Sequence, residues 1–210
     1  MNMIAAIIGA AVAAADPHVA QKIAERVQAF YQRTNDFTCR FDQEYTSAAM
    51  GSKMQSHGTL QVKKPGRMRW VYEAPTKKEL VIEGERLFQY SPEDNQVTVM
   101  KHFSPETYGA GLSFLWGRGN LAKDFDVAVA ERGDLPKGAD ALKLMPRGPA
   151  QFREIYFAVE RDGRVSATIV FDTMGNENRM LFREMKTNVG IADKEFKFVT
   201  PKGAAVNELP

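Results

Sequence analysis

Residues 58–75 read GTLQVKKPGRMRWVYEAP, and this stretch decides the fold. After the Pro65-Gly66 break, the apolar residues Met68, Trp70 and Tyr72 alternate with charged ones, Val71 being the exception. Successive side chains of a strand point to opposite faces, so this alternation predicts a strand with one buried face. That face must be covered by another part of the protein. The fold therefore depends on how much covering structure the rest of the chain supplies.

The same two-residue period recurs along most of the chain. Turn signals such as Pro65-Gly66, Gly84 and Asp162-Gly163 separate the periodic stretches. Connections this short imply antiparallel neighbours. We expect eleven strands, at residues 37–45, 58–64, 68–73, 79–83, 86–90, 96–101, 125–131, 141–145, 153–160, 164–172 and 178–186.

Two segments depart from this pattern. From Asp16-Pro17 to about Thr34, apolar residues repeat at helical spacing and predict an amphipathic helix. Residues 103–120 begin a second, short helix at Ser104-Pro105-Glu106, with four glycines in the segment. Each interior glycine costs about 1 kcal/mol relative to alanine, so this helix is weakly held by its own preferences. Its apolar residues are Leu112, Phe114, Leu115 and Trp116.

Two helices can cover only part of the apolar face of an eleven-stranded sheet. A curled, incompletely closed sheet with a hydrophobic hollow follows. The composition supports a folded chain, because 44% of the 210 residues are hydrophobic and 10% are aromatic. The formal net charge is only +2, with both signs interspersed, which gives no electrostatic footprint for nucleic acid.

The N-terminus has the character of an export signal. Residues 4–15 form an uncharged, small apolar run that ends in Ala13-Ala14-Ala15, as a signal-peptidase site does. The run is too short to span a membrane. No positive charge precedes it, so we expect residues 1–15 to be a truncated signal peptide, the alternative being an extension of the helix. No cysteine follows the run to anchor a lipid, and residues 16–210 are then a single exported domain.

No catalytic constellation is evident. His18, His57 and His102 lie far apart and lack the spacing of metal ligands. The single cysteine, Cys39, falls on an apolar strand face, where a free cysteine usually packs as a small hydrophobe. Motifs for an esterase nucleophile, a phosphate loop or a dinucleotide are absent. We expect no enzymatic activity, no metal and no cofactor.

Four stretches together resemble one known family. They are DFTCRFDQ at 36–43, the opening stretch at 58–75, IEGERLFQYSPEDNQVTV at 82–99 and FKFVTPKGAAV at 196–206. In order and spacing they are similar to the landmarks of the outer-membrane lipoprotein carrier family of Gram-negative periplasms, LolA. The landmarks span nearly the whole mature chain, and none of them is catalytic.

The resemblance implies a mainly β fold: an eleven-stranded antiparallel unclosed half-barrel, with helices as a lid over a hydrophobic cavity. The family is a periplasmic chaperone that holds the acyl chains of lipoproteins. It receives them from an inner-membrane ABC-type release complex and delivers them to an outer-membrane acceptor lipoprotein. We expect the carrier to be a monomer.

The resemblance also assigns residues. The cavity wall would contain Met68, Trp70, Phe88 and Tyr90. The lid would contain Leu112, Phe114, Leu115 and Trp116. Lys64 stands where the family usually has an arginine that latches the lid, and lysine lacks the planar fork for several simultaneous bonds. For each of these residues, an ordinary place in the core is the alternative.

Other functions stay open, because a fold does not determine a function. A periplasmic domain that senses a lipid signal with the same half-barrel is the main alternative. The acceptor lipoprotein is disfavoured by the missing lipid-anchor cysteine. A lipid-modifying enzyme is disfavoured by the absence of a nucleophile constellation.

Overall fold

The computed structural model describes residues 17–103 and 120–209. The elements are helix α1 (Pro17–Gln32), strands β1 (Asp36–Thr46), β2 (Lys53–Lys63), β3 (Arg67–Ala74), β4 (Lys78–Glu83), β5 (Arg86–Ser91) and β6 (Gln96–Met100), helix α4 (Leu121–Asp124), strands β7 (Phe125–Val129), β8 (Asp140–Pro146), β9 (Phe152–Val159), β10 (Val165–Asp172) and β11 (Glu177–Thr187), the short 3-10 helix η1 (Asp193–Phe196) and strand β12 (Ala205–Leu209).

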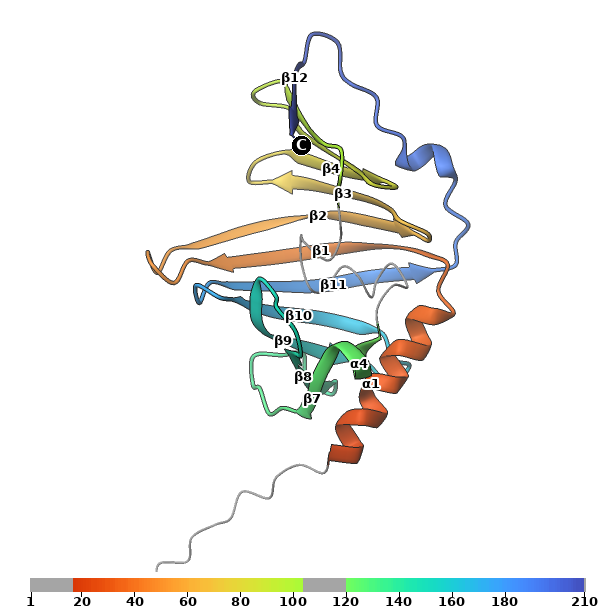
Figure 1. The fold of residues 1–210 in the computed structure, drawn as a ribbon, viewed down its shortest axis with the longest axis vertical. Helices are drawn as coiled ribbons and strands as arrows, with labels where there is room; N and C mark the ends of the chain where they lie inside the picture. The colour runs from red at the N-terminus through yellow and green to blue at the C-terminus, as the bar shows by residue number, and fades with distance from the viewer. Residues whose placement is uncertain (1–16, 104–119, 210) are drawn as a thin grey trace, which may run out of the picture.

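The strands form one sheet in the order β12-β6-β5-β4-β3-β2-β1-β11-β10-β9-β8-β7. The end strands β12 and β7 do not pair with each other, so the sheet curls without closing (Figure 1). The prediction of a mainly β, unclosed half-barrel is confirmed, and all eleven predicted strands are present.

The described residues contain a twelfth strand that the sequence did not predict. Strand β12 is exposed along its whole length and pairs in parallel with the edge strand β6. It is held by backbone hydrogen bonds and has no buried face, so it leaves no alternation of apolar and polar residues for sequence reasoning to detect. It covers the open edge that β6 would otherwise present.

Helix α1 covers one half of the inner face of the sheet. Its apolar stripe includes the buried Ile23 and Val27, and the helix packs on β7, β8 and α4. It ends two residues before the predicted end, and just beyond it the Thr34 hydroxyl donates to the Phe30 carbonyl at 2.8 Å. Beneath it, β8 and β9 contribute a close-packed core of Leu142, Leu144, Ile155 and Phe157.

The approach of α1 to the sheet requires a glycine in the β9–β10 turn. A Cβ built on Gly163 would lie 2.3 Å from the Arg26 carbonyl oxygen, and the φ angle of Gly163 is +95°. Both the close contact and the positive φ exclude larger residues there. The turn thus brings the helix near the end of the sheet where β1 begins.

The outer face of the other half is covered by the chain's own C-terminal segment. After β11 this segment passes through η1 and follows the edge of the molecule to β12 (Figure 1). Phe198 and Ala204 pack there against the buried residues Val81, Phe88, Val97 and Val99. The inner face of the same strands has no comparable cover from α1, which packs at the other half of the sheet.

Candidate functional site

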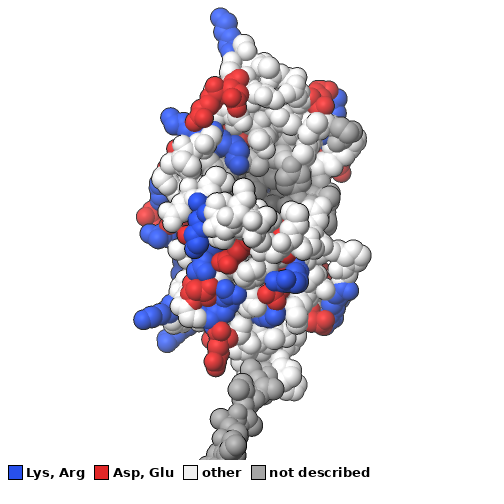
Figure 2. All heavy atoms as spheres, turned by 90° about the vertical axis from the view of Figure 1, so that its left-hand side faces the viewer, with Lys and Arg blue, Asp and Glu red and all other residues white. Residues whose placement is uncertain are grey.

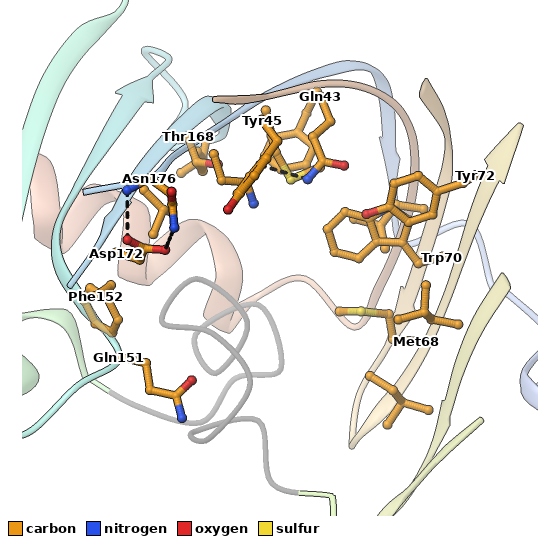
Figure 3. A pocket seen from close by; sticks show the side chains of 18 of the residues that line it. Gln43, Tyr45, Met68, Trp70, Tyr72, Gln151, Phe152, Thr168, Asp172 and Asn176 are labelled. Carbon is orange, nitrogen blue, oxygen red and sulfur yellow. Dashed lines mark hydrogen bonds between the residues drawn. The ribbon is translucent and has the colours of Figure 1, made fainter. Parts of the chain in front are cut away.

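The inner face of the half-barrel encloses a cavity of about 720 Å³ (Figure 3). Figure 2 shows the hollow on one side of the molecule, with a mainly uncharged rim and charges of both signs scattered around it. The volume falls within the range of about 300–1,000 Å³ that is usual for ligand pockets. Apolar residues form most of the wall, including Leu60, Met68, Trp70, Leu80, Ile82, Leu87 and Phe103.

Aromatic rings make one side of this wall. Phe41 lies edge-on to Trp70 and to Tyr72, with ring centroids 5.3 Å and 5.0 Å apart, and the last two rings stack at 6.0 Å. Such geometries stabilise beyond the area they bury. Trp70 and Tyr72 are nevertheless only half-buried, because they face the cavity. The rings therefore form a firm apolar surface that a ligand can contact.

A close backbone approach positions this aromatic wall. Gly58 on β2 lies at a bulge opposite β3, and a Cβ built there would be 1.8 Å from the Val71 carbonyl oxygen and 3.0 Å from the Phe41 ring. Only glycine permits that contact. The glycine that opens the 58–75 stretch thus allows the Phe41 ring to approach β3.

Another part of the cavity wall is polar. Side chains from β1, β10 and the β10–β11 turn line this part, namely Gln43, Tyr45, Thr168, Asp172 and Asn176 (Figure 3). Asn178 of β11 also lines it. Asn176 donates to Asp172 through its backbone N–H at 2.9 Å and its amide at 2.7 Å. Burial raises the pKa of Asp172, but these hydrogen bonds outweigh it and hold the pKa below its usual value. The polar side was not identified from the sequence.

Two of the four predicted cavity residues lie in the cavity wall. Met68 and Trp70 are on the inner face of β3, as the alternation in residues 67–73 indicates. That these two residues bind lipid stays a prediction.

Phe88 and Tyr90 lie on the outer face of β5, so their predicted place in the cavity is wrong. Phe88 stacks on Phe198 of the C-terminal segment with ring centroids 5.0 Å apart, and Tyr90 lies 6.4 Å from the same ring. The inner-face residue of β5 is Leu87, which pairs with Ile82 and lines the cavity. Both faces of β5 carry large apolar residues, so hydrophobicity did not distinguish them.

The predicted lid residues Leu112, Phe114, Leu115 and Trp116 lie outside the described residues, as do residues 1–15. The predicted latch, Lys64, is described. Its ammonium donates a hydrogen bond to the Tyr31 carbonyl at the end of α1. Burial holds the pKa of Lys64 below its ordinary value. Lys64 therefore joins the β2–β3 turn to the end of α1, where Tyr31 lines the cavity.

Nucleophilic chemistry has no support at Cys39. The thiol is 3% exposed, and burial raises its pKa to about 12, so it is protonated and inaccessible at neutral pH. The prediction that Cys39 packs as a small hydrophobe is confirmed. Within residues 17–103 and 120–209, no cluster of three or more His, Cys, Asp or Glu is arranged to hold a metal ion.

A family model described as "Outer membrane lipoprotein carrier protein LolA" matches residues 32–199 of this chain. The match covers the half-barrel from the end of α1 to the C-terminal segment. The chain belongs to the LolA family. The resemblance drawn from the four sequence stretches is thereby confirmed.

Relatives of this LolA-family chain agree over most of its length. An outer-membrane lipoprotein carrier protein of Methylobacillus flagellatus is 28% identical over 184 residues, which cover 87% of each chain. One from Dechloromonas aromatica is 27% identical over 208 residues, covering 98% of each. Among solved structures, an uncharacterized conserved protein from Thermus thermophilus is similar with a TM-score of 0.58 and 17% identity, over 91% of this chain and 99% of that one. This structural likeness shows the shared fold.

No helix within the described part of this LolA-family chain is long and apolar enough to cross a membrane.

Proposed function

We propose that this protein is a periplasmic chaperone that carries lipoproteins by holding their acyl chains in the half-barrel cavity. It accepts them from an inner-membrane ABC-type release complex and passes them to an outer-membrane acceptor lipoprotein. Residues 1–15 are its export signal, and residues 16–210 act as one monomeric carrier domain without enzymatic activity. Met68 and Trp70 are the wall residues that contact the chains.

One observation carries this proposal: a member of the lipoprotein carrier family has an apolar, aromatic-lined cavity of about 720 Å³. An acyl chain of about sixteen carbons gains roughly 12 kcal/mol on leaving water, at about 0.8 kcal/mol per CH₂. Escape into water would therefore be very slow. A membrane would accept the same chains about as well, so the carrier must load and unload by direct contact with its partners.

Retention of a native lipoprotein tests the proposal. Purified protein is incubated with spheroplasts that release a triacylated lipoprotein, and the soluble complex is isolated and analysed by mass spectrometry. We expect one lipoprotein bound per carrier. The same preparation is then made with Trp70→Gln and with Val71→Gln, the same polar change on a neighbouring residue of β3.

The two variants separate cavity contact from general damage to β3. Trp70 lines the cavity, and Val71, which pairs with Glu79 on β4, is absent from the described wall. Trp70→Gln should lose most of the bound lipoprotein while Val71→Gln retains it. Equal retention by both variants, or recovery of a free lipid in place of lipoprotein from the unmodified protein, would contradict the carrier function.

A further inference from the structure

The cavity wall changes from apolar to polar along the strand direction. On β1, Phe37 lines the cavity near α1, and Gln43 and Tyr45 line it near the β1–β2 hairpin. On β11, Phe182 and Met180 lead to Asn178 in the same direction. The strands are antiparallel and in register, so their polar ends meet at one end of the cavity.

Two hairpins build this polar end. The β1–β2 hairpin and the β10–β11 turn are joined by a hydrogen bond in which the Ala48 backbone N–H donates to the Asn176 side chain at 2.9 Å. Gln43 donates to Asn178 at 2.8 Å and links β1 to β11. These bonds hold the Asn176 and Asn178 amides in fixed positions, so the polar end is preorganised for a ligand.

The polar end has hydroxyl groups that are free to bind a ligand. The side chains of Tyr45 and Thr168 both line the cavity, and neither hydroxyl is hydrogen-bonded to any part of the chain that the structure describes. Each hydroxyl can donate one hydrogen bond and accept two. A ligand with amide groups would match them.

Charge at this end disfavours an anion. The described wall contains the carboxylate of Asp172 and no Lys or Arg. Lys78 is absent from this wall, and its ammonium lies over the Tyr72 ring, 4.3 Å from its centroid. An anionic phosphate placed among Gln43, Tyr45 and Thr168 would lose its hydration near a carboxylate, which is unfavourable.

We propose that this polar end binds the uncharged, amide-linked cysteine of the cargo, a group that phospholipids lack, and so selects acylated peptides over phospholipids with an anionic phosphate head. The inference rests on the proposed function and adds a basis for specificity to it. The apolar wall takes acyl chains of any origin. Tyr45 and Thr168 distinguish the groups to which those chains are attached.

Competition between two lipids with the same chains tests this. The first is a dipalmitoyl-glyceryl cysteine, N-acetylated and linked to an uncharged peptide amide, and the second is dipalmitoyl phosphatidylglycerol. Each displaces a fluorescent fatty acid from the purified protein. We expect the lipopeptide to bind at least tenfold more tightly than the phospholipid.

The variants remove hydroxyl groups without changing shape. Tyr45→Phe combined with Thr168→Val should weaken lipopeptide binding about tenfold, the effect of losing one or two hydrogen bonds, and leave phospholipid binding unchanged. Tyr90→Phe, which removes a hydroxyl on the outer face, is the matched control and should alter neither affinity. Melting curves confirm that the variants are folded.

The possible failures are distinguishable. If the unmodified protein binds both lipids equally, or the double variant weakens both by the same factor, the polar end does not select and this inference is wrong while the carrier function stands. If neither lipid displaces the fatty acid, the carrier function fails together with the inference.

Discussion

Strands β4 to β6 have apolar residues on both faces, β3 beside them has its aromatic residues on the inner face, and the protein uses the two faces differently. On the outer face, Phe88 lies under Phe198 and Val97 is fully buried. On the inner face, Trp70 and Tyr72 are only half-buried against a cavity. The chain covers the outer face with its own C-terminal segment and leaves the inner face for a ligand. Apolar alternation thus marks a strand without telling which face is the binding surface.

The largest expected effect is on the outer face. Phe88→Ala removes a ring packed between β5 and the C-terminal segment, and we expect the free energy of unfolding to fall by about 3 kcal/mol. Lipoprotein retention by the folded protein should not change. Trp70→Ala on the inner face should show the reverse, with a smaller loss of stability and a large loss of retention. Chemical denaturation and the spheroplast assay measure the two quantities.

The same two variants could also contradict this assignment of the two faces. If Trp70→Ala destabilised the protein as much as Phe88→Ala did, the inner face would be a close-packed core. If Phe88→Ala lost cargo while still folded, the outer face would contribute to binding.

A smaller effect is expected at Lys64, which bonds to the end of α1 and is absent from the described cavity wall. Lys64→Met removes the hydrogen bond to the Tyr31 carbonyl, and we expect a loss of about 1 kcal/mol in the free energy of unfolding. If this bond restrains α1 beside the cavity, cargo should also exchange faster. Lys64→Arg is the control and should preserve slow exchange. Unchanged exchange in Lys64→Met would show that Lys64 is not a latch.

The smallest effect concerns an ion cluster on the outer side of β9 to β11. Arg132 donates to Asp134 at 2.7 Å and 2.9 Å, and Arg179 adds another bond, so the pKa of Asp134 lies well below its usual range. A carboxyl with a depressed pKa stabilises the fold above its unfolded pKa, near 4, and this stabilisation is lost as the pH falls further.

Asp134→Asn has no carboxyl at this position to protonate. Between about pH 4, the ordinary pKa of an Asp carboxyl, and about pH 2, its free energy of unfolding should therefore fall slightly less than that of the unmodified protein. Urea denaturation at each pH measures this, and cargo retention at pH 7 should stay the same. A steeper acid dependence in the variant would contradict this assignment of the pKa.

Much of the fold follows from local periodicity. The two-residue alternation places Met68 and Trp70 on one face of β3, and the helical spacing from Pro17 predicts α1. Both depend on short-range geometry, which the sequence expresses directly. Strand β12 depends on an edge partner far away in the sequence, and its own residues carry no pattern.

The error at Phe88 has an instructive cause. Only Gly84 and Glu85 separate β4 from β5, so Glu83 pairs with Arg86 and the register is fixed. That register places Leu87 beside Ile82, on the face that also holds Met68, and places Phe88 beside Val81 on the other face. Counting from the turn would have assigned the faces correctly, whereas hydrophobicity alone could not.

The polar end of the cavity was missed for a different reason. Gln43, Thr168 and Asn178 come from three strands, and each is an ordinary partly exposed residue in its own segment. Their common location arises from the pairing of β1 with β11 and of β11 with β10. Such a surface is visible only after the long-range register is known.

Fluorescence quenching by a brominated acyl chain tests most directly whether the inner face is the lipid-binding surface. The chain has two tryptophans, so Trp116→Phe leaves Trp70 as the single reporter on the inner face. Replacing both tryptophans by Phe and introducing Phe88→Trp moves the reporter to the outer face. A lipopeptide with brominated chains should quench Trp70 strongly and leave the reporter at residue 88 nearly unchanged. Quenching of the outer reporter, or bound lipopeptide that leaves Trp70 unquenched, would contradict the account.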